Sequence, residues 1–66
     1  MVPIYYVGEE PEDDGGYEVH RDTCYRLPVL RKYLGVHASC EHAVARAREQ
    51  YAGAVGCRLC SHECRP

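Results

Sequence analysis

Two pairs of metal-ligating residue types, one at each end of a 32-residue segment, are the strongest constraint on how this chain can fold. Three residues separate His20 from Cys24, and two separate Cys57 from Cys60. A Cys-x-x-Cys turn brings both sulfurs onto one ion, and a strand end followed by a short turn can do the same for a His and a Cys. One imidazole and three thiolates suit tetrahedral Zn²⁺. The spacing therefore predicts that these four residues bind one Zn²⁺ per chain and clamp the segment between them.

The apolar content explains why such a clamp is needed. The 66 residues include no Phe, no Trp and one Met, so six Tyr supply all of the aromatic side chains. Ordering a chain of this length costs on the order of 100 kcal/mol of conformational free energy, and a core this small seldom offsets that cost without a disulfide, a metal or a partner. The length also excludes a multidomain enzyme. We therefore expect residues 1–66 to form a single zinc-binding domain.

The number of cysteines and the N-terminal sequence favour metal binding over disulfides. Five cysteines are an odd number, so a closed set of disulfides would leave one thiol over. No apolar run approaches the roughly 18 residues that span a bilayer, and the first residues carry no signal-peptide pattern. We therefore expect a cytoplasmic protein without membrane association, in a reducing compartment where disulfides are rare.

Charge is unevenly distributed along the chain. Eight Lys and Arg stand against ten Asp and Glu, a formal net charge of -2, so no overall basic excess indicates nucleic acid. Residues 1–20 hold six acidic residues and no Lys or Arg, whereas residues 21–66 hold eight basic and four acidic residues. The acidic, Gly- and Pro-rich residues 8–16 are typical of a flexible hairpin loop. The basic part of the chain, residues 21–66, could therefore bind a negatively charged partner.

The pattern of β-branched, aromatic and turn residues predicts an α+β fold with two or three short antiparallel strands and one helix. Residues 2–7 and 17–20 are expected to be the two strands of a hairpin. Residues 33–36 are expected to be a weaker third strand, because Gly35 lies inside it.

The helix is predicted from a one-sided apolar pattern. Ser39 is a suitable N-cap, and Gly53 a suitable C-cap. Between them, the apolar residues fall at positions 40, 43, 44, 47 and 51, which lie on one face of an α-helix. The sequence therefore predicts a helix over 40–51, and residues 61–66 are expected to be a short tail.

Other interpretations of the Cys and His residues stay open. The Cys-x-x-Cys pair could be a redox dithiol of the thioredoxin type, although that motif is followed by a helix and only six residues follow here. His20 could be a hydrogen-bonded strand residue. Cys40, on the apolar face of the predicted helix, is expected to be a small buried hydrophobic residue. His62 and Cys64 lie near enough in sequence to replace His20 or to bind a second ion.

With these pairs and the helix in place, the segment Tyr17–Cys60 resembles the small zinc domain of Ada-type DNA alkylation-repair proteins and its relatives in other bacterial proteins. The pattern is a strand running into a ligand, three residues, a Cys, an aromatic-containing strand, a helix and a Cys-x-x-Cys. It covers about two thirds of the chain, and the matching residues are Tyr17, Val19, His20, Cys24, Tyr33, Ser39, His42, Ala43, Gly56, Cys57 and Cys60.

The resemblance implies a structural zinc site in place of a repair activity. The methyl-accepting chemistry of the repair proteins requires a Cys at the first ligand position, where this chain has His20. A zinc-bound imidazole is no thiolate nucleophile, and the relatives with His at this position look like structural modules. Four protein ligands also leave no open position for a catalytic water. We therefore expect no enzymatic activity and assign no catalytic residue.

Two classes of function follow. The first is a zinc-stabilised module that binds another protein, because Tyr side chains combine apolar area with a hydroxyl and often anchor such contacts. The alternative is a nucleic-acid-binding zinc module that uses the Arg and Lys residues of 21–58, motivated by the resemblance. The residues concerned are Arg21, Arg26, Arg31, Lys32, Arg46, Arg48 and Arg58. Of these two classes we expect the first, in which the partner is another protein, and we expect no small-molecule substrate.

Overall fold

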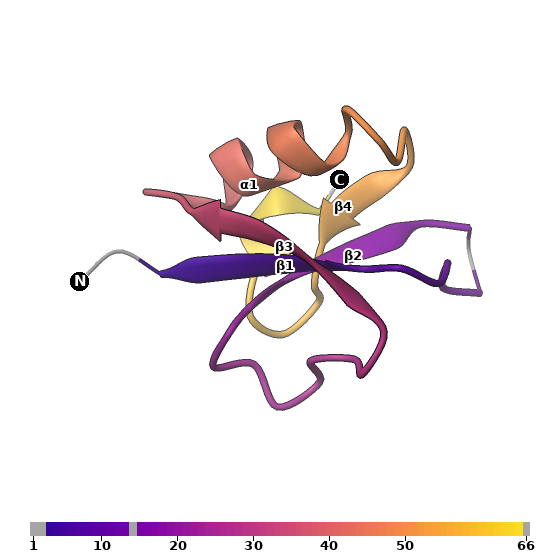
Figure 1. The fold of residues 1–66 in the computed structure, drawn as a ribbon, viewed down its shortest axis with the longest axis horizontal. Helices are drawn as coiled ribbons and strands as arrows, with labels where there is room; N and C mark the ends of the chain where they lie inside the picture. Colours follow the sequence, from indigo (N-terminus) through magenta and orange to yellow (C-terminus); the bar gives the residue numbers. More distant parts are fainter. Residues whose placement is uncertain (1–2, 14, 66) are drawn as a thin grey trace.

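A four-stranded sheet with one helix on one of its faces forms the fold (Figure 1). This computed structural model describes residues 3–13 and 15–65. The predicted α+β class is confirmed. In chain order the elements are β1 (Ile4–Gly8), β2 (Tyr17–Arg21), β3 (Arg31–Val36), α1 (Cys40–Ala47), β4 (Ala54–Gly56) and a short 3-10 helix, η1 (His62–Cys64).

The strand order in the sheet is β3-β1-β2-β4. The predicted hairpin is confirmed as the antiparallel pair β1 and β2, with Tyr6 opposite His20 and Val7 opposite Val19. Residues 1 and 2, which the predicted first strand included only in part, lie outside the described residues. The predicted third strand is also confirmed and begins two residues earlier, at Arg31.

The fourth strand corrects the sequence prediction of two or three antiparallel strands. β4 has only three residues, too few to show an alternating pattern, and it pairs parallel with β2. The sheet is therefore mixed. This parallel pair places Cys57 and Cys60, which follow β4, next to His20 and Cys24 at the end of β2.

The helix begins as predicted and ends earlier. Ser39 Oγ accepts a hydrogen bond from the His42 amide at 3.4 Å, which confirms the N-cap. The helix ends at Ala47 in place of Tyr51, and its C-cap is Arg48 in place of Gly53. Two contacts turn the chain back to the sheet: Arg48 Nε donates to the Ala54 carbonyl at 3.0 Å, and the Tyr51 ring packs on Tyr17 at 4.5 Å. After Ala47 the backbone continues in tighter turns, in which the Glu49 amide donates to the Arg46 carbonyl at 3.2 Å and the Gln50 amide to the Ala47 carbonyl at 3.0 Å.

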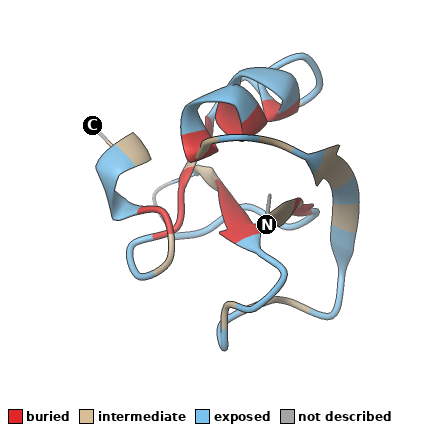
Figure 2. Cartoon of the chain, turned by 90° about the vertical axis from the view of Figure 1, so that its left-hand side faces the viewer, coloured by how far each residue is buried: buried red, intermediate tan, exposed pale blue. Residues whose placement is uncertain are grey.

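The core lies between the sheet and α1. Figure 2 shows the buried residues of α1 on the side that faces the sheet. Most of the side chains that meet there are small, which lets the helix approach the strands closely. The buried cluster consists of Tyr5, Val7 and Val19 from the sheet, Cys40, Ala43, Val44 and Ala47 from the helix, and Ala54 from β4.

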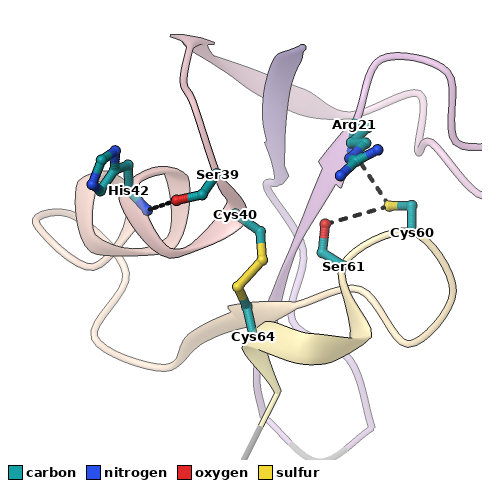
Figure 3. The surroundings of a disulfide bond; sticks show 7 residues. All are labelled: Arg21, Ser39, Cys40, His42, Cys60, Ser61 and Cys64. Atoms are coloured by element: carbon teal, nitrogen blue, oxygen red, sulfur yellow. Dashed lines mark hydrogen bonds between the residues drawn. A yellow bond between two sulfur atoms is a disulfide. The ribbon is translucent and has the colours of Figure 1, made fainter. Parts of the chain in front are cut away.

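A disulfide between Cys40 and Cys64 joins the first turn of α1 to η1 (Figure 3). Cys40 is buried, as expected, but it is no free thiol. The expectation that the cysteines bind metal in preference to one another is wrong for this pair, because the fold brings the helix start and η1 together. The odd number of cysteines argued against a closed set of disulfides, but it is compatible with one disulfide and three free cysteines.

Candidate metal centre

The parallel pairing of β2 and β4 brings the two ligand pairs to one edge of the sheet. Parallel strands end on the same side, so the turn after Arg21 and the turn after Gly56 meet. The Cys24 amide closes the first turn on the Arg21 carbonyl at 3.0 Å, and the Cys57 amide donates to the Val19 carbonyl at 2.9 Å. Both turns lie on the opposite side of the sheet from α1 (Figure 1).

The four predicted ligands are brought together. His20, Cys24, Cys57 and Cys60 each offer one ligand atom, and these atoms all lie within 4.8 Å of one another. Within the parts of the chain that the structure describes, this is the one His, Cys, Asp and Glu group with the geometry to hold a metal ion. The sulfurs of Cys24 and Cys57 are 3.9 Å apart. Tetrahedral Zn²⁺ with Zn–S bonds of about 2.3 Å places its sulfurs about 3.8 Å apart, so the spacing fits.

Burial favours the uncharged forms of two of these ligands, Cys24 and His20, in the absence of a cation. Cys57 is fully buried and His20 is 3% exposed, while Cys24 and Cys60 are half-buried. Desolvation raises the pKa of the Cys24 thiol to about 12, and the neighbouring Cys60 and Cys57 sulfurs act in the same direction. Burial, and then the Arg26 guanidinium, lower the pKa of His20, which keeps its imidazole neutral and able to bind a metal. A divalent cation would reverse the preference of the Cys24 thiol, because it stabilises the thiolate.

Backbone and hydroxyl donors already point at the sulfurs. The Arg21 amide donates to Cys60 Sγ at 3.3 Å, and Ser61 Oγ donates to the same sulfur at 3.7 Å (Figure 3). The Leu59 amide donates to Cys57 Sγ at 3.4 Å. These donors hold the Cys57 and Cys60 sulfurs in place at the candidate site.

His20 has one ring nitrogen without a partner. His20 Nδ1 is buried and makes no hydrogen bond within the described residues, while Nε2 lies 3.7 Å from Glu18 Oε1. A buried nitrogen left without a partner costs about 1–3 kcal/mol, so a ligand at this position removes a real penalty. This orphaned nitrogen and the three convergent sulfurs fit a bound metal ion.

The alternative assignments fare differently. Cys64 is no ligand, because its sulfur is bonded to Cys40. His62 is exposed and does not belong to the cluster. The Cys-x-x-Cys pair follows a three-residue strand and precedes a three-residue 3-10 helix, in place of the longer helix of a thioredoxin-type motif.

Sequence reasoning missed Glu18 and Arg65 as neighbours of the site. Glu18 is 4% exposed and accepts a hydrogen bond from Arg65 Nη1 at 3.1 Å. Side chains two positions apart on a strand lie on the same face, so the sequence could have indicated that Glu18 lies beside His20. No sequence signal could have placed Arg65 there, because its position depends on the parallel strand and the turn that follows it.

Comparisons with protein families, with curated proteins and with solved structures found no match for this chain. The resemblance to the zinc domain of the Ada-type repair proteins therefore stays a prediction. The fold and the cluster define a small α+β domain that can hold a metal ion through one His and three Cys. No helix within residues 3–13 and 15–65 has the length and apolar content to cross a membrane.

Proposed function

We propose that the chain is a non-enzymatic zinc module in which His20, Cys24, Cys57 and Cys60 hold one structural Zn²⁺ and the folded surface binds another protein. The observation that carries the proposal is the convergence of one imidazole and three sulfurs within 4.8 Å. Soft thiolate ligands select Zn²⁺ over the hard cations Mg²⁺ and Ca²⁺, which prefer oxygen ligands.

The metal would act on folding. Structural zinc contributes on the order of 10 to 16 kcal/mol of apparent binding free energy, while whole domains have a net stability of about 5 to 15 kcal/mol. The ligand pairs lie on segments 33 residues apart in sequence, measured from Cys24 to Cys57. A metal that joins them therefore holds β2, β4 and their turns together.

Metal analysis and chelation of the purified chain test this proposal. We expect about one Zn²⁺ per chain, and loss of the dispersed amide NMR spectrum when a chelator removes it. His62→Ala serves as the matched control, because His62 is an exposed His outside the cluster, and we expect this variant to retain its zinc. A metal-free chain that keeps its complete tertiary structure would contradict the proposal.

The proposal of a non-enzymatic role rests on the filled ligand set. Catalytic zinc keeps a position for water or substrate, and three thiolates with one imidazole complete a tetrahedron. A cobalt-substituted sample should show the absorption of a four-coordinate site and no exchangeable metal-bound water. Detection of such a water would overturn this part of the proposal.

The proposed protein-binding surface lies over the ligand turns. Tyr25 follows one ligand and Leu59 precedes another, and their side chains are 85% and 49% exposed. Together with Arg21 and Thr23 they line a hollow of about 330 Å³ beside the two half-buried cysteines. Large apolar side chains on turns held by a metal are already ordered before binding, which lowers the entropy cost of an interface.

The alternative, a nucleic-acid-binding surface, has less support. Several of the basic side chains are occupied by groups of the protein itself: Arg46 pairs with Glu49, Arg48 with the Ala54 carbonyl and Lys32 with Gln50. A second hollow holds three arginines but also three acids, namely Arg26, Arg58 and Arg65 with Glu12, Asp13 and Glu18. Its formal charge is therefore balanced, and it offers little attraction to phosphate.

Titration with duplex and single-stranded nucleic acid at two salt concentrations separates the two classes. A protein-binding module should bind only weakly, and added salt should abolish the binding. A salt-dependent complex tighter than about 10⁻⁶ M at physiological salt would favour the nucleic-acid alternative. For the protein class, a double variant Tyr25→Ala, Leu59→Ala should lose partner capture. Tyr33→Ala, which removes an exposed tyrosine of the sheet, should keep it.

Cytoplasmic localisation stays a prediction, and the disulfide makes it testable. Disulfides are rare in reducing compartments. Trapping of free thiols directly from cells should find Cys40 and Cys64 reduced if the protein is cytoplasmic. An oxidised pair would place the chain in an oxidising compartment.

A further inference from the structure

A buried carboxylate lies beside the candidate metal centre. Glu18 and His20 occupy alternate positions of β2, so both side chains lie on the face opposite Val19. Glu18 is 4% exposed and His20 is 3% exposed. A buried carboxylate is costly unless other groups pair with it, so the partners of Glu18 show what it does.

Each oxygen of Glu18 has a different partner. Oε2 accepts a hydrogen bond from Arg65 Nη1 at 3.1 Å, and the same nitrogen donates to the Gly56 carbonyl at 3.1 Å. Oε1 lies 3.7 Å from His20 Nε2. Arg65 thus fixes the carboxylate against the end of β4, and the other oxygen is left facing the imidazole.

We infer that His20 binds the metal through Nδ1, and that Glu18 is a positioning residue whose carboxylate accepts a hydrogen bond from the Nε2–H group. This inference rests on the proposed metal function. Its grounds are that Nε2 faces a carboxylate, whereas Nδ1 is buried without a hydrogen-bond partner in the described residues. A small rotation of either side chain shortens the 3.7 Å separation to a hydrogen bond of about 2.9 Å.

The arrangement does two things for the ligand. A hydrogen bond from the second ring nitrogen fixes which nitrogen carries the proton and how the ring is oriented. A carboxylate acceptor also raises the basicity of the metal-bound nitrogen. The Arg65 guanidinium offsets the charge of Glu18, which limits repulsion with a centre whose three thiolates and Zn²⁺ carry a formal charge of -1.

The tautomer of His20 tests the inference directly. In the zinc-loaded full chain, long-range ¹H–¹⁵N NMR should show His20 bound through Nδ1 and protonated at Nε2. Glu18→Gln should shift the Nε2 proton signal and speed its exchange with solvent, because the charged acceptor is gone. A spectrum in which Nε2 binds the metal would overturn the inference.

Zinc affinity gives the second measurement. Loss of an outer partner of a metal-bound His costs about 10- to 100-fold in metal affinity, and we expect a loss in this range for Glu18→Gln in a chelator competition. Glu9→Gln is the matched control, since it removes the same charge from an exposed side chain. Wild-type affinity in Glu18→Gln would overturn the inference.

Two outcomes separate this inference from the proposed function. A wild-type chain that binds no zinc contradicts the proposed function itself. A wild-type chain that binds zinc through His20 Nε2 contradicts only the role of Glu18. If Glu18→Gln fails to fold even in excess zinc, the tautomer of the wild-type protein still decides. Arg65→Gln, which keeps the carboxylate, should then show a smaller loss of affinity than 10-fold.

Discussion

The two faces of the sheet are held by different kinds of interaction. On the face toward α1, apolar side chains from strands and helix pack together, and a disulfide fixes the helix start to η1. On the other face lie the two ligand turns, with His20, three sulfurs and the buried Glu18. β2 supplies both faces, since Val19 points to the core while Glu18 and His20 point to the candidate metal site.

The difference teaches how a chain with little apolar area completes its fold. The helix face contains one fully buried large side chain, Tyr5, among small aliphatic residues. Such a core contributes little for each ordered residue. The opposite face has no comparable apolar cluster among the described residues, and the four candidate ligands lie there in its place. Under the proposed function, the stability of this face depends on the ion that they bind. Each of the following substitutions separates the contribution of one face from the other.

Loss of one metal ligand should have the largest effect. Cys57→Ser removes a fully buried sulfur from the cluster, and we expect the chain to lose its dispersed amide spectrum. Cys24→Ser and Cys60→Ser should do the same, and His20→Ala should cost nearly as much. Arg58→Ala, an exposed position between two ligands, is the control and should fold normally. A folded Cys57→Ser variant would show that the helix face suffices alone.

Removal of the disulfide should have the next largest effect. A cross-link across 24 residues stabilises by about 3 kcal/mol in the loop-entropy description. The double variant Cys40→Ser, Cys64→Ser should therefore lose about 3 kcal/mol in denaturant unfolding and keep its zinc. Release of zinc on removal of the disulfide would show that the two faces do not act independently.

A methyl group at Gly56 tests the close approach of β4 to the turn that leads into η1. A Cβ there would overlap the Ser61 carbonyl oxygen and lie 2.9 Å from Cys64 Cβ. We expect Gly56→Ala to cost about 2 kcal/mol in unfolding free energy, because the β4 backbone or the turn must shift. In Gly53→Ala the nearest contact is 3.4 Å, so this control should cost less. Equal effects of the two variants would contradict the close approach at Gly56.

The smallest effect is expected at the helix N-cap. Ser39→Ala removes the hydrogen bond to the His42 amide and should cost about 1 kcal/mol. Its zinc affinity should match that of the wild type, because Ser39 lies at the start of α1, away from the ligand turns. Thermal unfolding and chelator competition measure the two quantities separately. A large change in zinc affinity would show coupling between the helix and the site.

The candidate site was predictable because its ligands occur in pairs that are close together in the sequence. His20 with Cys24, and Cys57 with Cys60, are each close in sequence, so each pair converges through one turn whatever the rest of the fold does. The N-cap and the hairpin were predictable for the same reason. Each depends on residues near one another in the chain.

The missed features depend on contacts between distant segments. β4 has three residues and is a strand only because β2 lies beside it. The Cys40–Cys64 disulfide requires the helix start and η1 to meet, which no local pattern states. The segment after the early end of α1 makes contacts with the sheet through Arg48 and Tyr51, and these contacts join residues that no local pattern pairs. Tertiary contacts override local preference at each of these positions.

The parallel pairing of β2 with β4 cannot form during synthesis until the residues of β4 have been added. Cys57 follows Cys24 by 33 residues, and a ribosome adds about 5 to 20 residues per second. The first ligand pair therefore waits roughly 2 to 7 s for the second to be made. During this interval the nascent chain has only half of the candidate metal site, and the Cys24 thiol lacks its partners from the second turn.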